Sequence, residues 1–206
     1  MEKDAAMPYR EAMTRRRALF GIGTLALVSA APCPMARAEG PPPLNDDGLY
    51  EEPWFLQSFL VLSEDLELAT ANGKRFAVMW ELKGCPYCKE THFVNFADPE
   101  IRRFVQDNFE ILQLNLVGSR SVVDFDGEEL EERKLAQKWG IRFTPTTCFF
   151  PDLEHVAGDV PGQELEVARM PGYFRPPHFL AMFQYVQRKA YEETDFRSYL
   201  NSQQAS

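Results

Sequence analysis

The sequence predicts an α/β fold, and three observations carry that prediction. Short apolar runs typical of buried strands alternate with longer stretches whose apolar residues recur at helical spacing. Two cysteines, Cys85 and Cys88, stand between the first such strand and a helix-like run. A proline, Pro145, immediately precedes a later strand-like run, and proline is confined to strand starts and edges because it has no N–H for the ladder.

Residues 1–38 are typical of an export signal rather than of a folded domain. Arginines at 15–17 form a basic region, an apolar stretch follows at 18–31, and Ala36-Arg37-Ala38 offers the small residues that signal peptidase recognises. The run Thr14–Leu19 is similar to a twin-arginine signal. The apolar stretch is shorter than the ~20 residues that span a bilayer. We therefore expect export to the periplasm, with an uncleaved membrane anchor as the alternative.

Charge and composition bound the remaining classes of function. The chain has a formal net charge of −9, and residues 1–38 hold six of its basic but only three of its acidic residues, so the exported part is more acidic still. This balance argues against nucleic acid or an anionic membrane surface as a partner. We expect a monomer with a flexible linker at 39–52, one domain at 53–192 and a polar C-terminal tail at 193–206.

The first elements of that domain follow from local patterns. A helix is expected over 53–71, because its apolar residues fall near one face. A strand is expected over 75–81, where the continuous apolar run 76–80 suits a central strand buried on both faces. Asp98-Pro99 then starts a further helix by capping and by proline's preference for the first turn, and a strand follows at 110–116. The residues expected on the inner face of the first helix are Phe55, Phe59, Leu62, Leu66 and Ala69.

The second half of the domain is expected to continue the alternation. A loop should occupy 118–127, a helix 128–139 with Gly140 ending it, and a strand 147–150. An edge strand is expected at 164–169. A last helix should open at Pro176, with its buried side formed by Phe179, Met182, Phe183 and Val186.

The cysteine pair carries the readable chemistry. A strand, a tight turn and a helix in that order place Cys85 at a helix N-terminus, where unpaired N–H groups and the helix dipole favour a thiolate. Cys85 would be the exposed nucleophile, and Cys88, one turn on, the resolving thiol. A structural disulfide and a metal site completed by His92 are the alternatives. Cys148 lies inside an apolar strand and is expected to be a buried small hydrophobe.

The element order resembles the thioredoxin fold over residues 54–191. The residues that carry the resemblance are Gly84–Cys88, Trp139–Thr146 and Met170–Tyr173. It implies a central mixed β-sheet flanked by helices, with an extra N-terminal helix and a C-terminal tail. It also implies a thiol–disulfide oxidoreductase that needs no cofactor and no metal.

The same resemblance implies how a substrate would be held. Cys85 and Cys88 are the catalytic pair of such enzymes. Pro145 would follow a cis peptide bond and pack beside the sulfurs, and Thr144 would offer its backbone to the substrate. Pro86 and Tyr87, between the two cysteines, complete the implied substrate-binding set.

Within the superfamily the sequence is most similar to the periplasmic thioredoxins of sulfur-oxidation (Sox) gene clusters. The shared features are Lys89 after the pair and the runs 97–100, 124–127 and 180–186. This likeness implies reduction of periplasmic protein disulfides by a protein that a membrane thiol reductase of the DsbD/CcdA type keeps reduced. The alternatives are a disulfide oxidase or isomerase of the DsbA/DsbC type, and a non-catalytic metal-binding module on the same fold.

Two departures from thioredoxin matter for the chemistry. Pro86-Tyr87 between the cysteines is more similar to glutaredoxins, so the redox potential cannot be copied from thioredoxin. Thioredoxin also buries an aspartate under its pair, whereas Val78 and Met79 stand at the matching strand positions here. Glu81 and Lys83 are the nearest candidates for that proton transfer, and the alternative is that each is an exposed charge near the rim.

Overall fold

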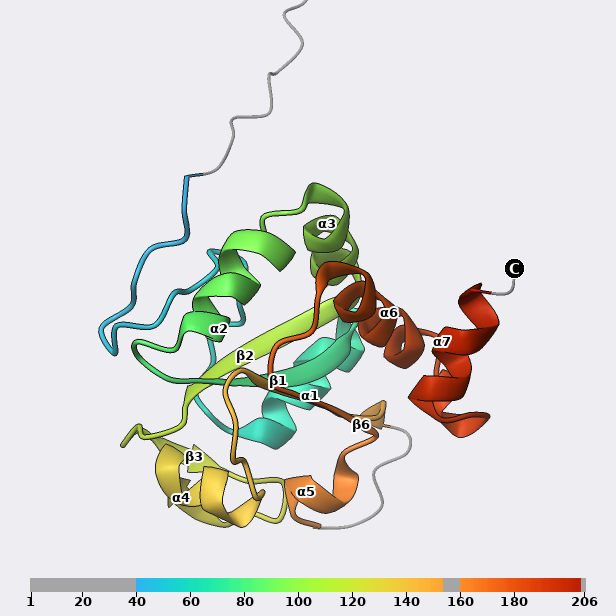
Figure 1. The fold of residues 1–206 in the computed structure, drawn as a ribbon. Helices are drawn as coiled ribbons and strands as arrows, with labels where there is room; N and C mark the ends of the chain where they lie inside the picture. The colour runs from blue at the N-terminus through green and yellow to red at the C-terminus, as the bar shows by residue number, and fades with distance from the viewer. Residues whose placement is uncertain (1–39, 154–159, 205–206) are drawn as a thin grey trace, which may run out of the picture. The chain divides into compact units, whose positions relative to one another are not determined.

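A four-stranded mixed sheet forms the centre of the domain (Figure 1). The structure, a computed structural model, describes residues 40–153 and 160–204, so the expected export signal at 1–38 lies outside the described residues. Strand β1 pairs in parallel with β2 and antiparallel with β5, which pairs antiparallel with β6. The predicted α/β fold with a mixed sheet is confirmed. In spatial order the strands are β2 (Phe109–Asn115), β1 (Arg75–Glu81), β5 (Thr146–Phe149) and β6 (Ala168–Pro171).

Strand β1 divides the interior into two hydrophobic cores. Ala77 and Met79 point to one face of the sheet, and Phe76, Val78 and Trp80 to the other, as the two-residue period of a strand requires. Every residue from Phe76 to Glu81 is buried, as expected for a central strand. The first core is closed by α3 (Pro99–Asn108) and α6 (Pro176–Gln187), and the second by α1 (Leu62–Ala71) and α4 (Glu132–Lys138).

The helices of the first face start and pack as predicted. Asp98 caps α3, because its Oδ1 accepts hydrogen bonds from the backbone N–H groups of Glu100 at 2.8 Å and Ile101 at 3.2 Å. Helices α3 and α6 lie beside each other over the sheet (Figure 1). The predicted inner face of α6 is buried and comprises Phe179, Met182, Phe183 and Val186.

The helix expected over 53–71 is shorter than predicted, because its two halves serve opposite faces of the sheet. Helix α1 begins only at Leu62. Phe55 packs in the core of the first face, whereas Leu62 and Leu66 pack in that of the second. One straight helix cannot reach both cores, and the chain turns between them at Leu60, whose φ is 65°. Phe59, expected inside, is 96% exposed.

The segment predicted as a flexible linker instead packs against the domain from Leu44 onward. Leu44 and Tyr50 form an isolated β-bridge, and Asn45 accepts a backbone hydrogen bond from Gly48. Leu49 and Glu52 are both buried. We call residues 44–52 the N-terminal strap. Linker-like composition was misleading here because the few apolar and polar side chains of the strap find partners far along the chain.

A hairpin replaces much of the loop predicted at 118–127. Strands β3 (Ser121–Val123) and β4 (Glu129–Glu131) pair antiparallel, and α4 therefore starts at Glu132 rather than at residue 128. Buried Asp124 holds the hairpin to its surroundings, because its Oδ2 accepts a hydrogen bond from Nε1 of Trp139 at 3.2 Å. Strands of three residues are too short for a reliable alternation pattern.

Later elements also differ in detail from the prediction. The expected edge strand at 164–169 is split into a helical turn, α5 (Gly162–Leu165), and strand β6. A 3₁₀ turn (Ala190–Glu192) ends the predicted domain, and the polar tail expected at 193–206 contains α7 (Phe196–Gln204), which packs on α6 through Tyr199. Among residues 40–153 and 160–204, no helix has both the length and the apolar character needed to cross a membrane.

Substitutions of Phe55 and Phe59 test whether the chain before α1 is non-helical, as the structure shows. We expect Phe55→Ala to lower the free energy of unfolding by about 3–5 kcal/mol, because it empties part of a packed core. Phe59→Ala should change it by less than about 0.5 kcal/mol, because that side chain is exposed. Urea unfolding followed by tryptophan fluorescence measures both. Equal losses for the two variants would support a continuous helix over 53–71 instead.

Candidate functional site

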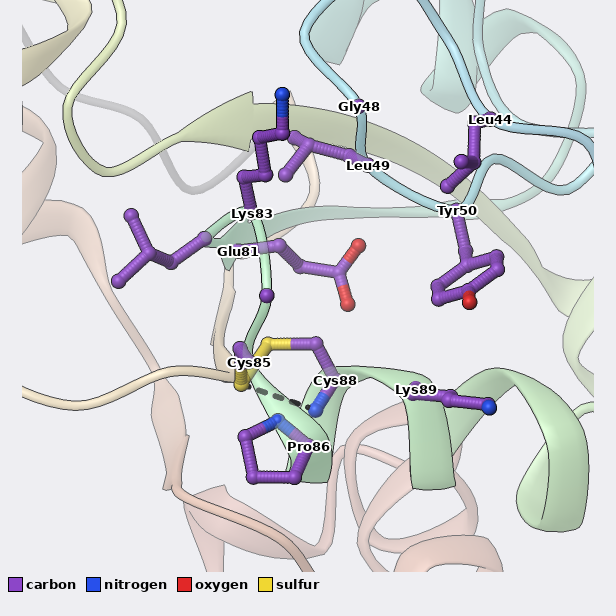
Figure 2. Close-up of a pocket in the computed structure, with 12 residues that line it drawn as sticks. Leu44, Gly48, Leu49, Tyr50, Glu81, Lys83, Cys85, Pro86, Cys88 and Lys89 are labelled. Carbon is purple, nitrogen blue, oxygen red and sulfur yellow. Dashed lines mark hydrogen bonds between the residues drawn. A yellow bond between two sulfur atoms is a disulfide. The ribbon is translucent and has the colours of Figure 1, made fainter.

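The cysteine pair lies at the junction of β1 and α2 (Pro86–Glu90). Cys85 is the N-cap of α2, and Cys85 and Cys88 are joined as a disulfide with their Cα atoms 5.3 Å apart. The backbone N–H of Cys88 donates to Sγ of Cys85 at 3.1 Å, the dashed line in Figure 2. Gly84 provides the turn between strand and helix with a φ of 76°, which glycine adopts without strain.

The two sulfurs differ in accessibility. Cys85 is partly exposed, whereas Cys88 is only 4% exposed. Pro86 and Tyr87 between them are exposed. Helix α2 continues without a break into a π-helical turn, η1 (Thr91–Asn95), which directs the following side chains into the first core. A partner disulfide could therefore reach Cys85 directly, and Cys88 only through Cys85.

The loop before β5 closes one side of the pair. The Thr144–Pro145 peptide bond is cis, as the resemblance implied. The carbonyl oxygen of Thr144 lies 3.5 Å from Sγ of Cys85, although 59 residues separate them. The structure thus brings Thr144 and Pro145 close to Cys85, which Pro86 and Tyr87 follow in the sequence.

A groove of about 670 Å³ runs along this side of the pair. Its aromatic wall includes Tyr87, which stacks on Tyr173 with ring centroids 6.0 Å apart, and Phe143, which is 63% exposed. Arg142 and Arg175 also line it. The groove is therefore apolar in part and basic in part, on a chain that is acidic as a whole.

A second cavity, of about 450 Å³, lies on the other side of the disulfide. Cys85 and Cys88 form part of its wall, and the N-terminal strap contributes Leu44, Leu49 and Tyr50. Figure 2 shows the Glu81 side chain extending from the end of β1 across this cavity, with one carboxylate oxygen turned toward Cys88. The pair thus has the groove of Tyr87 and Phe143 nearby, and it shares a cavity with the carboxylate of Glu81.

Glu81 is not the exposed charge that the alternative interpretation described. It is 1% exposed and lies on the same face of β1 as Met79, beneath the start of the active-site helix. Its Oε2 accepts hydrogen bonds from Nε2 of Gln113 and from the ring of His92, the latter at 3.0 Å. Lys83, the other candidate, is exposed. Strand alternation places Glu81 on the face of Ala77 and Met79, but its burial follows from the segments that cover the end of β1.

His92 is the site residue whose position the sequence reasoning missed. Its side chain is 1% exposed, and both ring nitrogens face carboxylates: Nδ1 lies 2.9 Å from Oε1 of Glu52 and Nε2 lies 3.0 Å from Oε2 of Glu81. The sequence did contain a signal for this burial. His92 lies four residues from Cys88 and four from Phe96, both of which are buried, and residues at that spacing share one face of a helix. With both nitrogens engaged, His92 is not free to complete a metal site with the cysteines.

The surroundings of His92 favour its charged form. Burial by itself would lower the pKa of His92, but hydrogen bonds and charge from Glu52 and Glu81 outweigh it and raise that pKa to about 9. Carboxylates only accept hydrogen bonds, so a ring that donates to both must be an imidazolium. A cation therefore lies buried beside the carboxylate that shares a cavity with the disulfide.

Cys148 is separate from this chemistry. It is 0% exposed within β5, which confirms the expected burial. That burial raises the pKa of its thiol well above the ordinary value, so Cys148 is both inaccessible and protonated at neutral pH.

The comparisons with known proteins identify the class of protein. Residues 62–187 match the thioredoxin-like domain family, and the chain belongs to that family. Its disulfide-bonded Cys85–Cys88 pair is consistent with thiol–disulfide exchange. No curated protein sequence matches the chain.

Three solved structures are similar to part of this chain. A thioredoxin-fold protein from Helicobacter pylori is 21% identical, with 65% of this chain and 86% of that chain covered and a TM-score of 0.49. A thioredoxin from Thermus thermophilus is 25% identical over 60% and 82% of the two chains, with a TM-score of 0.45. The oxidised C-terminal domain of DsbD from Neisseria meningitidis is 14% identical over 60% and 90%, with a TM-score of 0.39.

The charge of His92 can be measured directly. We expect its imidazole to titrate near pH 9 in NMR spectra of the wild-type protein, because two carboxylates stabilise the protonated ring. In Glu52→Gln one of those charges is lost, so the titration should move toward the ordinary value of about 6.5. His178, which is exposed, serves as the internal reference. A wild-type titration of His92 at or below pH 6.5 would contradict the ion-paired arrangement.

Proposed function

We propose that this chain is an exported thiol–disulfide oxidoreductase that reduces disulfides of partner proteins in the periplasm. The observation that carries the proposal is the geometry of Cys85. It is partly exposed, caps a helix, is paired with Cys88 and lies against the backbone of Thr144. Structural disulfides have no need of an exposed, helix-capping sulfur beside an open groove.

The reaction would start from the reduced pair. The helix N-terminus and the N–H of Cys88 stabilise negative charge on Sγ of Cys85. The Cys85 thiolate attacks a substrate disulfide, a mixed disulfide forms, and one substrate sulfur leaves as a thiolate. Cys88 then attacks Sγ of Cys85 and releases the second substrate sulfur, so two electrons pass from the pair to the substrate.

The groove beside Cys85 is the proposed place for the substrate chain. An extended segment could pair with the backbone at Thr144 as a short added strand. Tyr87 and Phe143 offer exposed aromatic surface to side chains that flank the substrate cysteine. Pro86 and Pro145 would then border the reacting sulfur without adding competing N–H donors.

Glu81 is the group we propose as the proton acceptor for Cys88. It is buried, lines the same cavity as both sulfurs, and has one carboxylate oxygen turned toward Cys88 (Figure 2). The exposed position of Lys83 makes it the weaker candidate. Deprotonation of Cys88 matters because this thiol is buried, and burial favours its unreactive neutral form.

The cellular setting rests on sequence alone. The signal-like residues 1–38 support the periplasm as the location, by a route similar to twin-arginine export. The resemblance to SoxW, the periplasmic thioredoxin of Sox gene clusters, supports a role in sulfur oxidation with the sulfur-carrier protein as substrate. A membrane thiol reductase of the DsbD/CcdA type would return the pair to its reduced form.

The direction of electron flow depends on the redox potential of the pair. We expect equilibration with glutathione and dithiothreitol to give a potential well below about −150 mV, because a reductant must hold its electrons less tightly than its substrates do. Quantifying the reduced and oxidised forms after alkylation measures this value. A potential near or above about −150 mV would instead favour an oxidase or isomerase of the DsbA/DsbC type.

The covalent intermediate provides a test of the activity itself. Cys88→Ala should accumulate disulfide-linked partners in a periplasmic extract, because nothing then resolves the mixed disulfide. Cys85→Ala should trap none, since the accessible nucleophile is gone. Cys148→Ala is the matched control and should behave as wild type, because that thiol is buried in β5. Equal trapping by Cys85→Ala and Cys88→Ala would overturn the assigned roles.

A further inference from the structure

Three buried ionisable residues form a chain behind the disulfide. Glu52 comes from the N-terminal strap, Glu81 from the end of β1 and His92 from η1, and their exposed fractions are 6%, 1% and 1%. His92 bridges the two carboxylates at 2.9 and 3.0 Å. Burying three charges is costly unless each is paired. The arrangement is therefore a built feature of the site, and the chemistry described above gives a role to Glu81 but none to Glu52 or His92.

The two oxygens of Glu81 have different surroundings. Oε2 accepts from both His92 and Gln113. Oε1 is buried and has no hydrogen-bond partner among the described residues. A buried carboxylate oxygen without a donor is unfavourable. The Cys88 side chain lines the same cavity as Glu81, so its thiol in the reduced protein would be a nearby donor for this oxygen.

The N-terminal strap reaches Glu81 by two routes. One runs from Glu52 through His92. The other runs through Gln113, whose amide donates to Glu81 and to the carbonyl oxygen of Tyr50, the latter at 2.6 Å, and accepts from Asn45 at 3.1 Å. Residues that precede the family's matched range at 62–187 thus orient a group that shares a cavity with the active disulfide.

We propose that His92 and Glu52 are positioning residues that set the basicity and orientation of Glu81 for the step in which Cys88 resolves the mixed disulfide. The inference rests on the proposed redox function. The proton of the Cys88 thiol passes to Oε1 of Glu81, the Cys88 thiolate attacks Sγ of Cys85, and the substrate thiolate leaves. The dithiol is oxidised by two electrons and the substrate disulfide is reduced; the proton on Glu81 then returns to solvent.

The charges around Glu81 determine the direction of each substitution effect. His92 supplies the nearby positive charge and Glu52 the nearby negative charge. Other ionisable groups on the cavity wall are Tyr50, Lys83, Lys89 and the two cysteines. On the β2 side, Arg120 donates to the carbonyl oxygen of Gln113 and pairs with Glu132. The substitutions below leave all of these in place.

If His92 and Glu52 position Glu81, substituting them should shift the pH dependence of the resolution rate in opposite directions. Removing the cation in His92→Gln takes away the positive charge beside the Glu81 carboxylate, so the rate of resolution should rise with pH about one unit later than in wild type. Removing the anion in Glu52→Gln should move the same rise about one unit earlier, over the lower part of the pH range where His92 keeps its charge in this variant. In Glu81→Gln this rise of the resolution rate with pH should be absent. A purely structural role would not displace the two variants in opposite directions.

The measurement uses the reduced full chain and oxidised glutathione as the probe. Acid quenching followed by mass spectrometry separates the glutathione adduct on Cys85 from the final disulfide, so attack and resolution are timed separately between pH 5 and 8. Attack by Cys85 should change less than about twofold in all variants. The matched controls are His178→Gln and Glu67→Gln, because both side chains are exposed and lie outside the cavity wall.

The outcomes separate this inference from the function on which it rests. Unchanged resolution profiles in His92→Gln and Glu52→Gln, or shifts in the same direction, would overturn the positioning roles while leaving the redox function intact. Absence of any glutathione adduct on wild-type Cys85 would overturn the proposed function itself. If His92→Gln does not fold, the earlier rise in Glu52→Gln alone decides the question, because a damaged site would resolve more slowly at every pH.

Discussion

Burial of β1 on both faces is the constraint on which the rest of the structure depends. A strand covered on each side must carry apolar residues without interruption, and Phe76 to Trp80 does so. Its partners fix its position, with β2 on one edge and β5 on the other. The end of β1 is therefore held rigidly, and it is there that Glu81, the Gly84 turn and Cys85 follow one another.

The antiparallel pairing of β1 with β5 has a direct consequence for the site. Because Trp80 pairs with Thr146, the residues just before β5 lie beside the residues just after β1. Thr144 and Pro145 are thus brought to Cys85 by sheet register alone. The same pairing therefore places Thr144, which lines the groove, against Sγ of Cys85.

The buried charges near the disulfide are unfavourable in the interior unless they are paired. Glu52, Glu81 and His92 are stable in the interior only because each has a partner of opposite charge. Gln113 and the N-terminal strap complete the hydrogen bonding around Glu81. Packing alone does not explain why an ionised group lines the same cavity as the sulfurs, and the proton transfer that we propose gives it a role.

Local patterns predicted the elements whose causes are local. β1 followed from its apolar run, the start of α3 from the Asp98 cap, and the inner face of α6 from its helical spacing. The β3–β4 hairpin was missed because three-residue strands carry too little pattern. The helix before β1 was overextended because Phe55 and Leu62 obey one helical period yet belong to different cores.

The sequence by itself determined the α/β class, the cysteine pair and its place at the start of a helix, because each depends on residues within one turn or one strand. Only the tertiary structure decided that Glu81 is buried, that His92 is clamped between two carboxylates and that the N-terminal strap belongs to the site. Glu52 and His92 are 40 residues apart in the chain. Contacts of that kind arise from the packing of separate elements, and composition and periodicity carry no information about them.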